Sequence, residues 1–317
     1  QTVEIVKVLY RGADILILDE PTAVLTPQET EKLFRVLRKM RDDGKAIVII
    51  THKMHEVKSL SDRVAVLRNG QYIGDMKTSE TNITEMTNMM VGHTVTLNID
   101  RPDPVDPKPR IEVEGLTVRN EEGVVKLKDV SFTANSGEIL GIAGISGCGQ
   151  KELLEAIAGL QPVESGTIAY MEPDGTKEML IGKDPLKIAE MGVSLSFVPE
   201  DRLGMGLVGN MDLTDNMMLR SFRKGKTPFV NRKPARELAE HVVESLEVVT
   251  PGIHTPVRRL SGGNVQKVLL GREIASSPTV LLTAYAVRGL DINSSYTIYD
   301  LLNEQKKKGV AVIFVGE

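Results

Sequence analysis

Ile15-Leu16-Ile17-Leu18-Asp19-Glu20-Pro21 is an apolar run that ends in two carboxylates. The run predicts a strand, and the polar turn and helical pattern that follow it, to about Met40, favour a parallel sheet covered by helices. Ligands of open α/β sheets bind at the carboxyl edge, where Asp19 and Glu20 would lie. One carboxylate there can hold Mg²⁺, usually through water, and its neighbour can polarise an attacking water as a general base. An acidic turn on the surface is the competing interpretation.

His52 follows the next predicted strand, Ile47 to Thr51, and is therefore expected at the same edge of the sheet. A neutral imidazole at this position can contact a γ-phosphate or orient the attacking water. A lone histidine at a strand end is more often structural, so the sequence leaves both interpretations open.

The helix between these two strands carries its own start and stop signals. Thr26 to Glu29 reads as a capping box with proline at the first helical position. Gly44 is predicted to end the helix as a C-terminal cap, and the strand Ala46 to Ile50 follows it.

The same order of strand, turn, helix, glycine and strand occurs a second time near the end of the sequence. Leu16 recurs as Leu281 and Gly44 as Gly309, a constant offset of 265 residues without gaps. Two copies of a unit of this length imply a parent protein of roughly 500 residues. We therefore expect this chain to hold the end of one copy and most of the next, as a fragment of a longer protein.

The segment between the copies, Asn98 to Arg110, contains four prolines and is predicted to be an extended linker. The expected organisation is thus residues 1–97 as the end of the first copy, 98–110 as the linker and 111–317 as the second copy. The second copy opens on the alternating pattern Ile111 to Glu114, which is typical of a strand.

Gly144-Ile145-Ser146-Gly147-Cys148-Gly149-Gln150-Lys151 follows a predicted strand and precedes a predicted helix. This order places backbone amides around a phosphate. In the pattern G-x-x-x-x-G-K-[ST], however, Gln150 stands where lysine belongs and Lys151 where the metal-binding hydroxyl belongs. The loop is therefore expected to keep its amides but to lose the lysine charge on the β- and γ-phosphates.

The second copy also lacks the polar groups of the first. At the offset of 265, Asp19 becomes Ala284, Glu20 becomes Tyr285 and His52 becomes Glu317. The first copy is therefore predicted to carry the catalytic groups, and the second to be degenerate.

Leu260-Ser261-Gly262-Gly263-Asn264 precedes a helix that is predicted to run from Val265 to about Ala275. A serine and two glycines at a helix N-terminus form a second candidate anion site. A generic helix cap that happens to contain glycines is the alternative.

Composition excludes several classes of protein. The 317 residues carry a net charge of -4, which excludes a large basic field for nucleic acid, and the absence of Trp argues against a platform that stacks bases. One cysteine excludes a fold held together by disulfides. No apolar run reaches the 18 residues or so that a transmembrane helix needs.

Taken together, Leu260 to Asn264, Ile15 to Pro21, His52 and the altered phosphate loop resemble the ATP-binding cassette of ABC transporters. More narrowly, the chain resembles the tandem-cassette ATPases of bacterial importers for simple sugars and nucleosides. The strings that carry this resemblance are DEPTAVLTPQE (Asp19–Glu29), THKMHEV (Thr51–Val57), FVPEDR (Phe197–Arg202) and RGLD (Arg288–Asp291). Lys77 to Asn82 and Met90 to Gly92 are most similar to the nucleoside-importing branch.

The resemblance implies a P-loop NTPase α/β fold, with the second cassette nearly whole and only the C-terminal part of the first. It implies ATP and Mg²⁺ as cofactors, with Asp19 as the metal carboxylate, Glu20 as the catalytic base and His52 as the switch histidine. The implied nucleotide-binding residues are Gly144, Ser146, Gly147, Gly149, Gln150, Lys151, Ser261, Gly262 and Gly263. By the same resemblance, Ser261 to Gly263 would contact the γ-phosphate in a composite site between two paired cassettes.

The implied function is ATP hydrolysis that drives uptake of a sugar or nucleoside. The implied partners are transmembrane permease subunits, which the segment from Leu203 to about Arg232 would approach, and indirectly a periplasmic or lipoprotein substrate-binding protein. No nucleic-acid partner is expected, and the implied location is peripheral, at the cytoplasmic face of the cell membrane. This chain alone is expected to hydrolyse little ATP. A non-catalytic nucleotide-sensing module and a soluble ABC ATPase outside transport are the alternatives.

Overall fold

The computed structural model describes residues 13–22, 25–68, 70–92, 99, 101–120, 122–144, 147–190, 195–222 and 230–316. The chain divides into two compact units. The first unit comprises Gln1–Asn98 with Asp291–Asn293, and the second comprises the rest of the chain.

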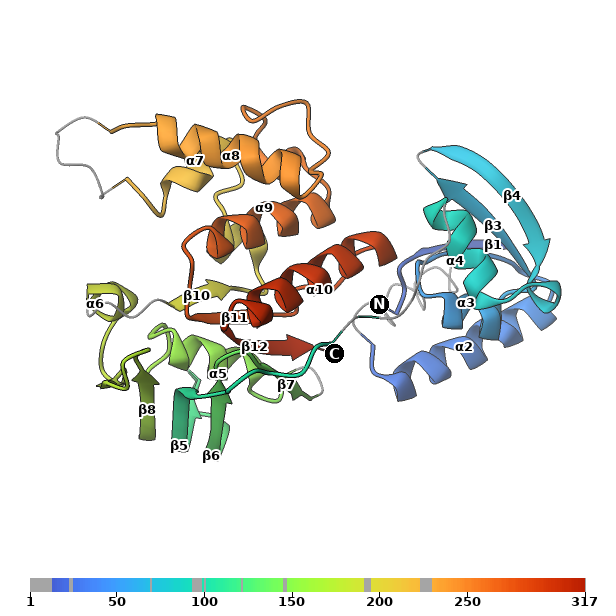
Figure 1. Cartoon of the computed structure of the whole chain (residues 1–317). Helices are drawn as coiled ribbons and strands as arrows, with labels where there is room; N and C mark the ends of the chain where they lie inside the picture. The colour runs from blue at the N-terminus through green and yellow to red at the C-terminus, as the bar shows by residue number, and fades with distance from the viewer. Residues whose placement is uncertain are drawn as a thin grey trace. The chain divides into compact units, whose positions relative to one another are not determined.

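The first unit is built on a β-α-β element (Figure 1). Strand β1 (Ile15–Asp19) pairs in parallel with β2 (Ala46–Ile50), and α2 (Pro27–Asp42) connects them. The remaining elements are α3 (Met54–Leu60), β3 (Arg63–Arg68), β4 (Gln71–Lys77), a short 3₁₀ turn (Thr78–Glu80) and α4 (Ile83–Val91). Strands β3 and β4 form an antiparallel hairpin.

Helix α2 begins where the sequence predicts. Thr26 caps it and accepts a hydrogen bond from the Glu29 backbone, while the Glu29 carboxylate accepts one from the Thr26 backbone, which confirms the capping box. Asp43 occupies the C-cap, and Gly44 follows with a φ of +86°, a left-handed conformation that glycine adopts without strain.

Among the residues that the structure describes, the β1–β2 sheet is covered on one face. Leu16 packs against the apolar stripe of α2, which comprises Leu33, Phe34, Leu37 and Met40. On the opposite face, Ile15 and Ile17 are 64% and 66% exposed, and Val48 and Ile50 are also exposed. Four β-branched side chains of a parallel pair thus remain in water, although strands of this kind are usually buried on both faces.

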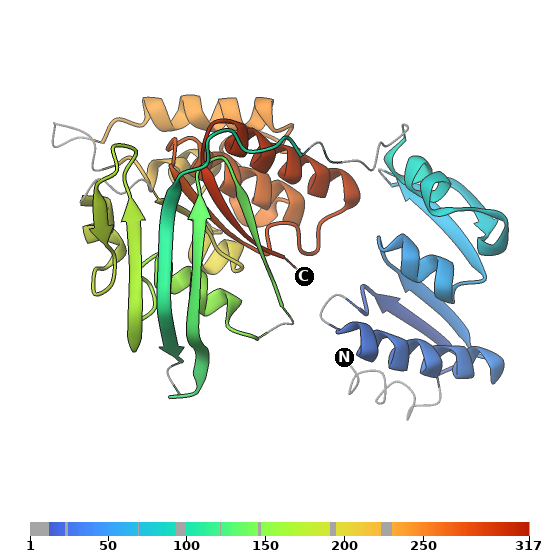
Figure 2. The ribbon, with the colours of Figure 1, turned by 60° about the horizontal axis from the view of Figure 1, so that its bottom comes forward.

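The second unit contains two four-stranded sheets. The parallel sheet has the order β10-β11-β12-β7, with β7 (Ile139–Ala143), β10 (Leu195–Val198), β11 (Val280–Ala284) and β12 (Ala311–Gly316). The antiparallel sheet has the order β6-β5-β8-β9, with β5 (Pro109–Arg119), β6 (Val125–Asn135), β8 (Ser165–Met171) and β9 (Lys177–Met179). Its long strands lie side by side in Figure 2.

The antiparallel sheet was not expected, because the alternation of strands and helices predicted only a parallel one. Strand β5 turns directly into β6 without a helix between them, and such a short connection joins antiparallel strands. Strand β5 also begins at Pro109, which pairs with Asn135, so the last two residues of the predicted linker belong to the sheet.

Helices cover both faces of the parallel sheet. Alternate residues of β11 divide between two cores: Val280 and Leu282 pack on the side of α5 (Gln150–Ile157), and Leu281 packs on the side of α9 (Gly262–Ile274) and α10 (Ile292–Lys307). Figure 1 shows α9 and α10 on the opposite side of this sheet from α5. The remaining helical elements are α6 (Pro185–Glu190), η2 (Arg202–Gly206), α7 (Leu213–Met218), α8 (Lys233–Ser245) and a 3₁₀ turn (Val257–Arg259). No helix in the described ranges is both long and apolar enough to cross a bilayer.

The structure confirms the internal repeat residue by residue. Register pairs Ile15↔Ala46 and Asp19↔Ile50 recur as Val280↔Ala311 and Ala284↔Val315, each 265 positions later. Helices α2 and α10 begin and end at the same offset. The two β-α-β elements are therefore equivalent in backbone, although few of their side chains are the same.

Candidate functional site

Glu20 lies one residue beyond β1 in a backbone conformation that non-glycine residues rarely adopt. Its φ is +43°, and its N–H donates to the Ile50 carbonyl at 2.9 Å. Tyr285, its equivalent in the second unit, has a φ of +49° and donates to the Val315 carbonyl at 2.9 Å. Backbone strain of this kind is concentrated at functional sites, and here the fold imposes it twice.

The Glu20 carboxylate and the His52 imidazole contact each other at the edge of the sheet where the sequence places both residues. Oε1 of Glu20 lies 2.8 Å from Nδ1 of His52 and accepts a hydrogen bond from the His52 backbone N–H at 3.2 Å. Oε2 of Glu20 is buried and has no hydrogen-bond partner among the described residues. One oxygen of this carboxylate is thus held in place, while the other remains available to accept a proton or a hydrogen bond.

Asp19 ends β1, and its side chain is exposed beside Glu20. Two neighbouring carboxylates at a strand end suit Mg²⁺, which binds to one or two carboxylates and completes its shell with waters and phosphate oxygens. The orphaned Oε2 of Glu20 fits such a site, because it needs a polar partner that the chain itself does not supply.

Three residues that sequence reasoning missed brace the turn after Glu20. The Thr22 hydroxyl, which is 1% exposed, lies 2.7 Å from both carboxylate oxygens of Glu56 on α3. Nζ of Lys53 donates to the Thr22 carbonyl at 3.2 Å and lies 3.5 Å from the Glu56 carboxylate. No spacing rule relates Thr22 to Glu56, because 34 positions separate them.

In the second unit, the phosphate loop joins β7 to α5 as predicted. Gly149 is the N-cap of α5 with a φ of +96°, and a β-carbon there would lie 2.5 Å from the Lys126 carbonyl oxygen. Gly147 has a φ of +84° with open space around it. Ser146, which we named as a nucleotide contact, lies outside the described residues. The described part of the loop therefore leads the chain into a helix N-terminus, where free backbone amides attract phosphate.

The two altered positions of the loop point in different directions. Gln150 is buried, and its amide lies so close to Gly144 that a β-carbon there would clash with it. Lys151 is half-exposed and extends into a pocket, where its Nζ lies 3.7 Å from Oε1 of Glu155. The positive charge of the loop is thus kept, but one position later than in the usual pattern.

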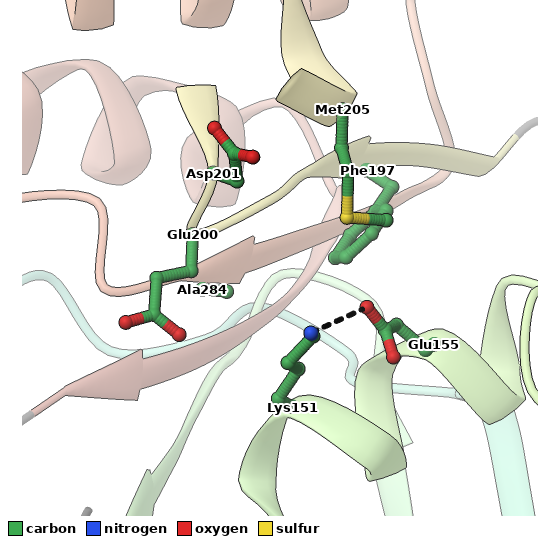
Figure 3. Close-up of a pocket in the computed structure, with 7 residues that line it drawn as sticks. All are labelled: Lys151, Glu155, Phe197, Glu200, Asp201, Met205 and Ala284. Atoms are coloured by element: carbon green, nitrogen blue, oxygen red, sulfur yellow. Dashed lines mark ion pairs between the residues drawn. The ribbon is translucent and has the colours of Figure 1, made fainter. Parts of the chain in front are cut away.

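Figure 3 shows this pocket, which has a volume of about 290 Å³. Lys151 and Glu155 reach into it from α5, while Glu200 and Asp201 approach from the turn after β10. Phe197, Met205 and Ala284 complete its lining. Burial raises the pKa of the Glu155 carboxyl above its ordinary value, against the smaller opposing effect of Lys151.

The remaining two acids of the pocket are already bonded to the protein. Glu200 forms an ion pair with Arg288 at 2.5 Å. The carboxylate of Asp201 accepts hydrogen bonds from the backbone N–H groups of Leu203 and Gly204 and thereby caps η2. Neither group is oriented as a free metal ligand.

The second candidate anion site lies at the start of α9. Ser261 is the N-cap and accepts hydrogen bonds from the backbone and side-chain nitrogens of Asn264. The helix begins at Gly262, three residues before the predicted start, because both glycines adopt helical geometry. The side chain of Arg202 lies against Gly262, so the Glu-Asp-Arg segment and this helix end are in contact.

The predicted site residues therefore fall into two groups. Asp19, Glu20 and His52 belong to the first unit, whereas Gly144–Lys151 and Ser261–Gly263 belong to the second. Ala284 stands in the second unit at the position equivalent to Asp19, as the repeat predicts, and Glu317 lies outside the described residues.

Comparison with known proteins agrees with this geometry. The model of the ABC transporter family matches residues 127–283. The chain is 38% identical to a glucose import ATP-binding protein of Haloferax volcanii and covers 57% of it. It is 36% identical to a nucleoside import ATP-binding protein of Lactococcus lactis, of which it covers 62%, and 37% identical to a ribose import ATP-binding protein of Streptomyces avermitilis, of which it covers 58%. In each case the whole chain is aligned.

The chain thus spans about three fifths of the length of the curated relatives that it matches. Among solved structures, it is similar to a dimeric ATP-binding cassette in a post-hydrolysis state with bound ADP and Pi. That match has a TM-score of 0.55 and 21% identity, and it covers 65% of this chain and 88% of the other. At this identity the likeness shows a shared fold.

Proposed function

Because this chain belongs to the ABC transporter family, we propose that it serves in the ATP-hydrolysing subunit of an importer for a simple sugar or a nucleoside. The names of its relatives indicate this class of substrate. The relatives are named ATP-binding proteins, so we expect ATP to be the ligand of this chain as well.

The observation that carries the proposal is the contact between Glu20 and His52 at the end of β1 and β2. Oε2 of Glu20 would accept a proton from the attacking water, since the other oxygen of this carboxylate is held by His52. His52 would keep the carboxylate in place and present its remaining ring nitrogen to the γ-phosphate. Asp19 would hold Mg²⁺, which neutralises charge on the phosphates when it is bound.

Only one of the two copies can perform this chemistry. Ala284 and Tyr285 take the positions of Asp19 and Glu20 on an equivalent backbone, so the second copy has neither the metal carboxylate nor the base. We assign hydrolysis to the site that contains Glu20, and nucleotide binding without efficient hydrolysis to the loop Gly144 to Lys151.

We further propose that residues 1–97 are the C-terminal part of a first cassette and residues 111–317 a second, degenerate one. The open apolar face of the β1–β2 sheet supports this division, since further elements of a cassette would cover it. The shorter length of the chain relative to its relatives is consistent with it. Pairing of the cassettes would bring Ser261 to Gly263 to the phosphates of the site that contains Glu20.

The permease is expected to dock on the segment that follows the Glu-Asp-Arg turn. Large apolar side chains are exposed at seven described positions there: Leu203, Met205, Val208, Met211, Leu219, Phe222 and Val230. Such a density on one segment indicates an interaction surface, and a partner in the membrane would place the subunit at the cytoplasmic face. The substrate-binding protein would reach the complex only through the permease.

Purification of the tagged protein from its membranes tests this function. We expect a multi-span membrane protein to co-purify, and the complex of that protein with the longer parent of this chain to release phosphate from ATP. Residues 1–143 contain no phosphate-loop pattern, so this chain by itself should turn over well below about 1 s⁻¹, the low end of the ordinary enzyme range. Co-purification with ribosomes or DNA-repair proteins instead would favour an ABC ATPase outside transport, and ATP binding without turnover by the complex would favour a nucleotide sensor.

A further inference from the structure

We propose that the pocket at Lys151 binds a nucleoside polyphosphate without a divalent cation, with the Lys151 ammonium in the place of the metal. The inference rests on the proposed function, because it takes the loop Gly144 to Lys151 to be a nucleotide site. It concerns which form of the ligand, free or metal-bound, that site accepts.

The pocket lacks the oxygen ligands that a metal ion needs. Ala284 lines the pocket at the position equivalent to Asp19 in the first copy, and its methyl group has no atom that can coordinate a cation. Lys151 occupies the position of the metal-binding hydroxyl in the phosphate-loop pattern. The pocket therefore does not fit Mg²⁺.

The acidic side chains of the pocket already form ion pairs or hydrogen bonds with other residues. The Glu200 carboxylate pairs with Arg288, and the Asp201 carboxylate caps η2 through two backbone N–H groups. Glu155 pairs with Lys151 itself, and burial favours its protonated form. A divalent cation would have to break one of these contacts before it gained a carboxylate ligand.

The Lys151 ammonium already supplies a positive charge in the pocket. Lys151 lines the pocket from the first turn of α5, next to the helix N-terminus, where backbone amides attract phosphate. A divalent ion in the same 290 Å³ pocket would be repelled by this ammonium. Phosphate oxygens would instead attract Lys151 away from Glu155, since a charge-assisted hydrogen bond is stronger than the present contact of 3.7 Å.

The test is equilibrium binding of a fluorescent ATP analogue to the full chain, once with excess EDTA and once with Mg²⁺. The affinity should be nearly the same in both. Lys151→Ala should weaken binding in EDTA by about ten-fold, the worth of one hydrogen bond to a charged group. Lys233→Ala is the matched control, because Lys233 forms an i,i+4 pair with Glu237 on α8 at the same 3.7 Å and should not affect binding.

A gain of metal dependence provides the second arm. Lys151→Ser should weaken binding in EDTA about as much as Lys151→Ala does, and the double variant Lys151→Ser with Ala284→Asp should bind the analogue more tightly with Mg²⁺ than in EDTA. Tight binding by the unchanged chain that requires Mg²⁺, or equal binding by Lys151→Ala, would overturn this inference while leaving the nucleotide site intact. No binding in either condition would overturn the nucleotide site itself, and the proposed function of the loop with it.

Discussion

Glu20 and Tyr285 occupy the same strained backbone position in two copies of one element, and Glu20 contacts His52 there. The two turns therefore share one backbone geometry although their side chains differ in chemistry. The guanidinium carbon of Arg288 lies over the Tyr285 ring, 5.4 Å from the ring centroid. Tyr285 is almost fully buried. At this position the second copy has a packing residue where the first copy has a carboxylate.

Gly149 and Gly147 both have a positive φ, but only Gly149 lies close to other atoms. Alanine substitutions at the two positions therefore distinguish the cost of a steric clash from the cost of the backbone conformation. Gly149→Ala should cost about 3 kcal/mol of unfolding free energy, because the new methyl group meets Lys126 in a left-handed backbone. Gly147→Ala should cost only about 1 kcal/mol, since nothing lies within 4 Å of the new methyl group. Urea unfolding of both variants measures this difference, and equal losses would contradict the close approach.

Glu155 should make stability depend on pH. Burial raises its pKa above the ordinary value of 4.5, so ionisation of this carboxyl opposes folding. Glu155→Gln should therefore stabilise the chain near neutral pH, and the gain should disappear as the pH falls below 4.5. Urea midpoints across this range test the prediction. Glu237→Gln, at the exposed equivalent pair on α8, should show no such gain, and a loss at neutral pH from Glu155→Gln would contradict it.

At the scale of elements, a buried ion cluster links three parts of the second unit. Glu273 on α9 is fully buried between Arg272 and Arg220, which lies just beyond α7. Arg272 also donates to the Gly206 carbonyl of η2 at 2.7 Å. The helix that begins at the serine-glycine cap is thus tied to the segment that carries the proposed permease surface.

Removal of the central acid should be costly. Glu273→Ala should lower the unfolding free energy by about 3–5 kcal/mol, because it leaves Arg272 buried without its counter-charge. Arg220→Ala should cost less than about 1 kcal/mol, because that side chain is half-exposed and the Arg272 pair remains. Thermal unfolding of both variants tests this order, and a larger loss from Arg220→Ala would contradict it.

Local signals in the sequence predicted most of the elements. The capping box at Thr26, the glycine at 44 and the apolar runs fixed the β-α-β bounds to within a few residues, because each depends on neighbours in the chain. The Glu20–His52 contact was also predictable, since parallel strands bring their carboxyl ends together. The brace of Thr22 and the Glu273 cluster were not, because they join residues 34 and 53 positions apart that no periodicity relates.

At the scale of the whole molecule, the exposed apolar segment makes a prediction about membrane association. The double variant Met211→Asp with Phe222→Asp should reduce the fraction of the protein that sediments with its permease-containing membranes, because charges would be buried at the interface. Val105→Asp is the control, since Val105 is 88% exposed and lies outside this segment. Equal membrane association of all three proteins would contradict the proposed docking surface.

We propose that hydrolysis belongs to the first copy, whose β-α-β element has the carboxylates and the histidine, and not to the second copy, whose equivalent element lacks them. The repeat supports this division in its backbone, and the side chains at positions 19, 20, 284 and 285 support it in their chemistry. We therefore expect a single hydrolytic site per pair of copies.

The most direct test is ATP hydrolysis by the importer complex that contains this chain, with Glu20→Gln compared with Tyr285→Phe at the equivalent position. Glu20→Gln should lower the rate by at least about 100-fold, the usual contribution of a general base. Tyr285→Phe should leave the rate unchanged. Equal losses from the two variants, or a loss from Tyr285→Phe alone, would contradict the assignment of hydrolysis to the first copy.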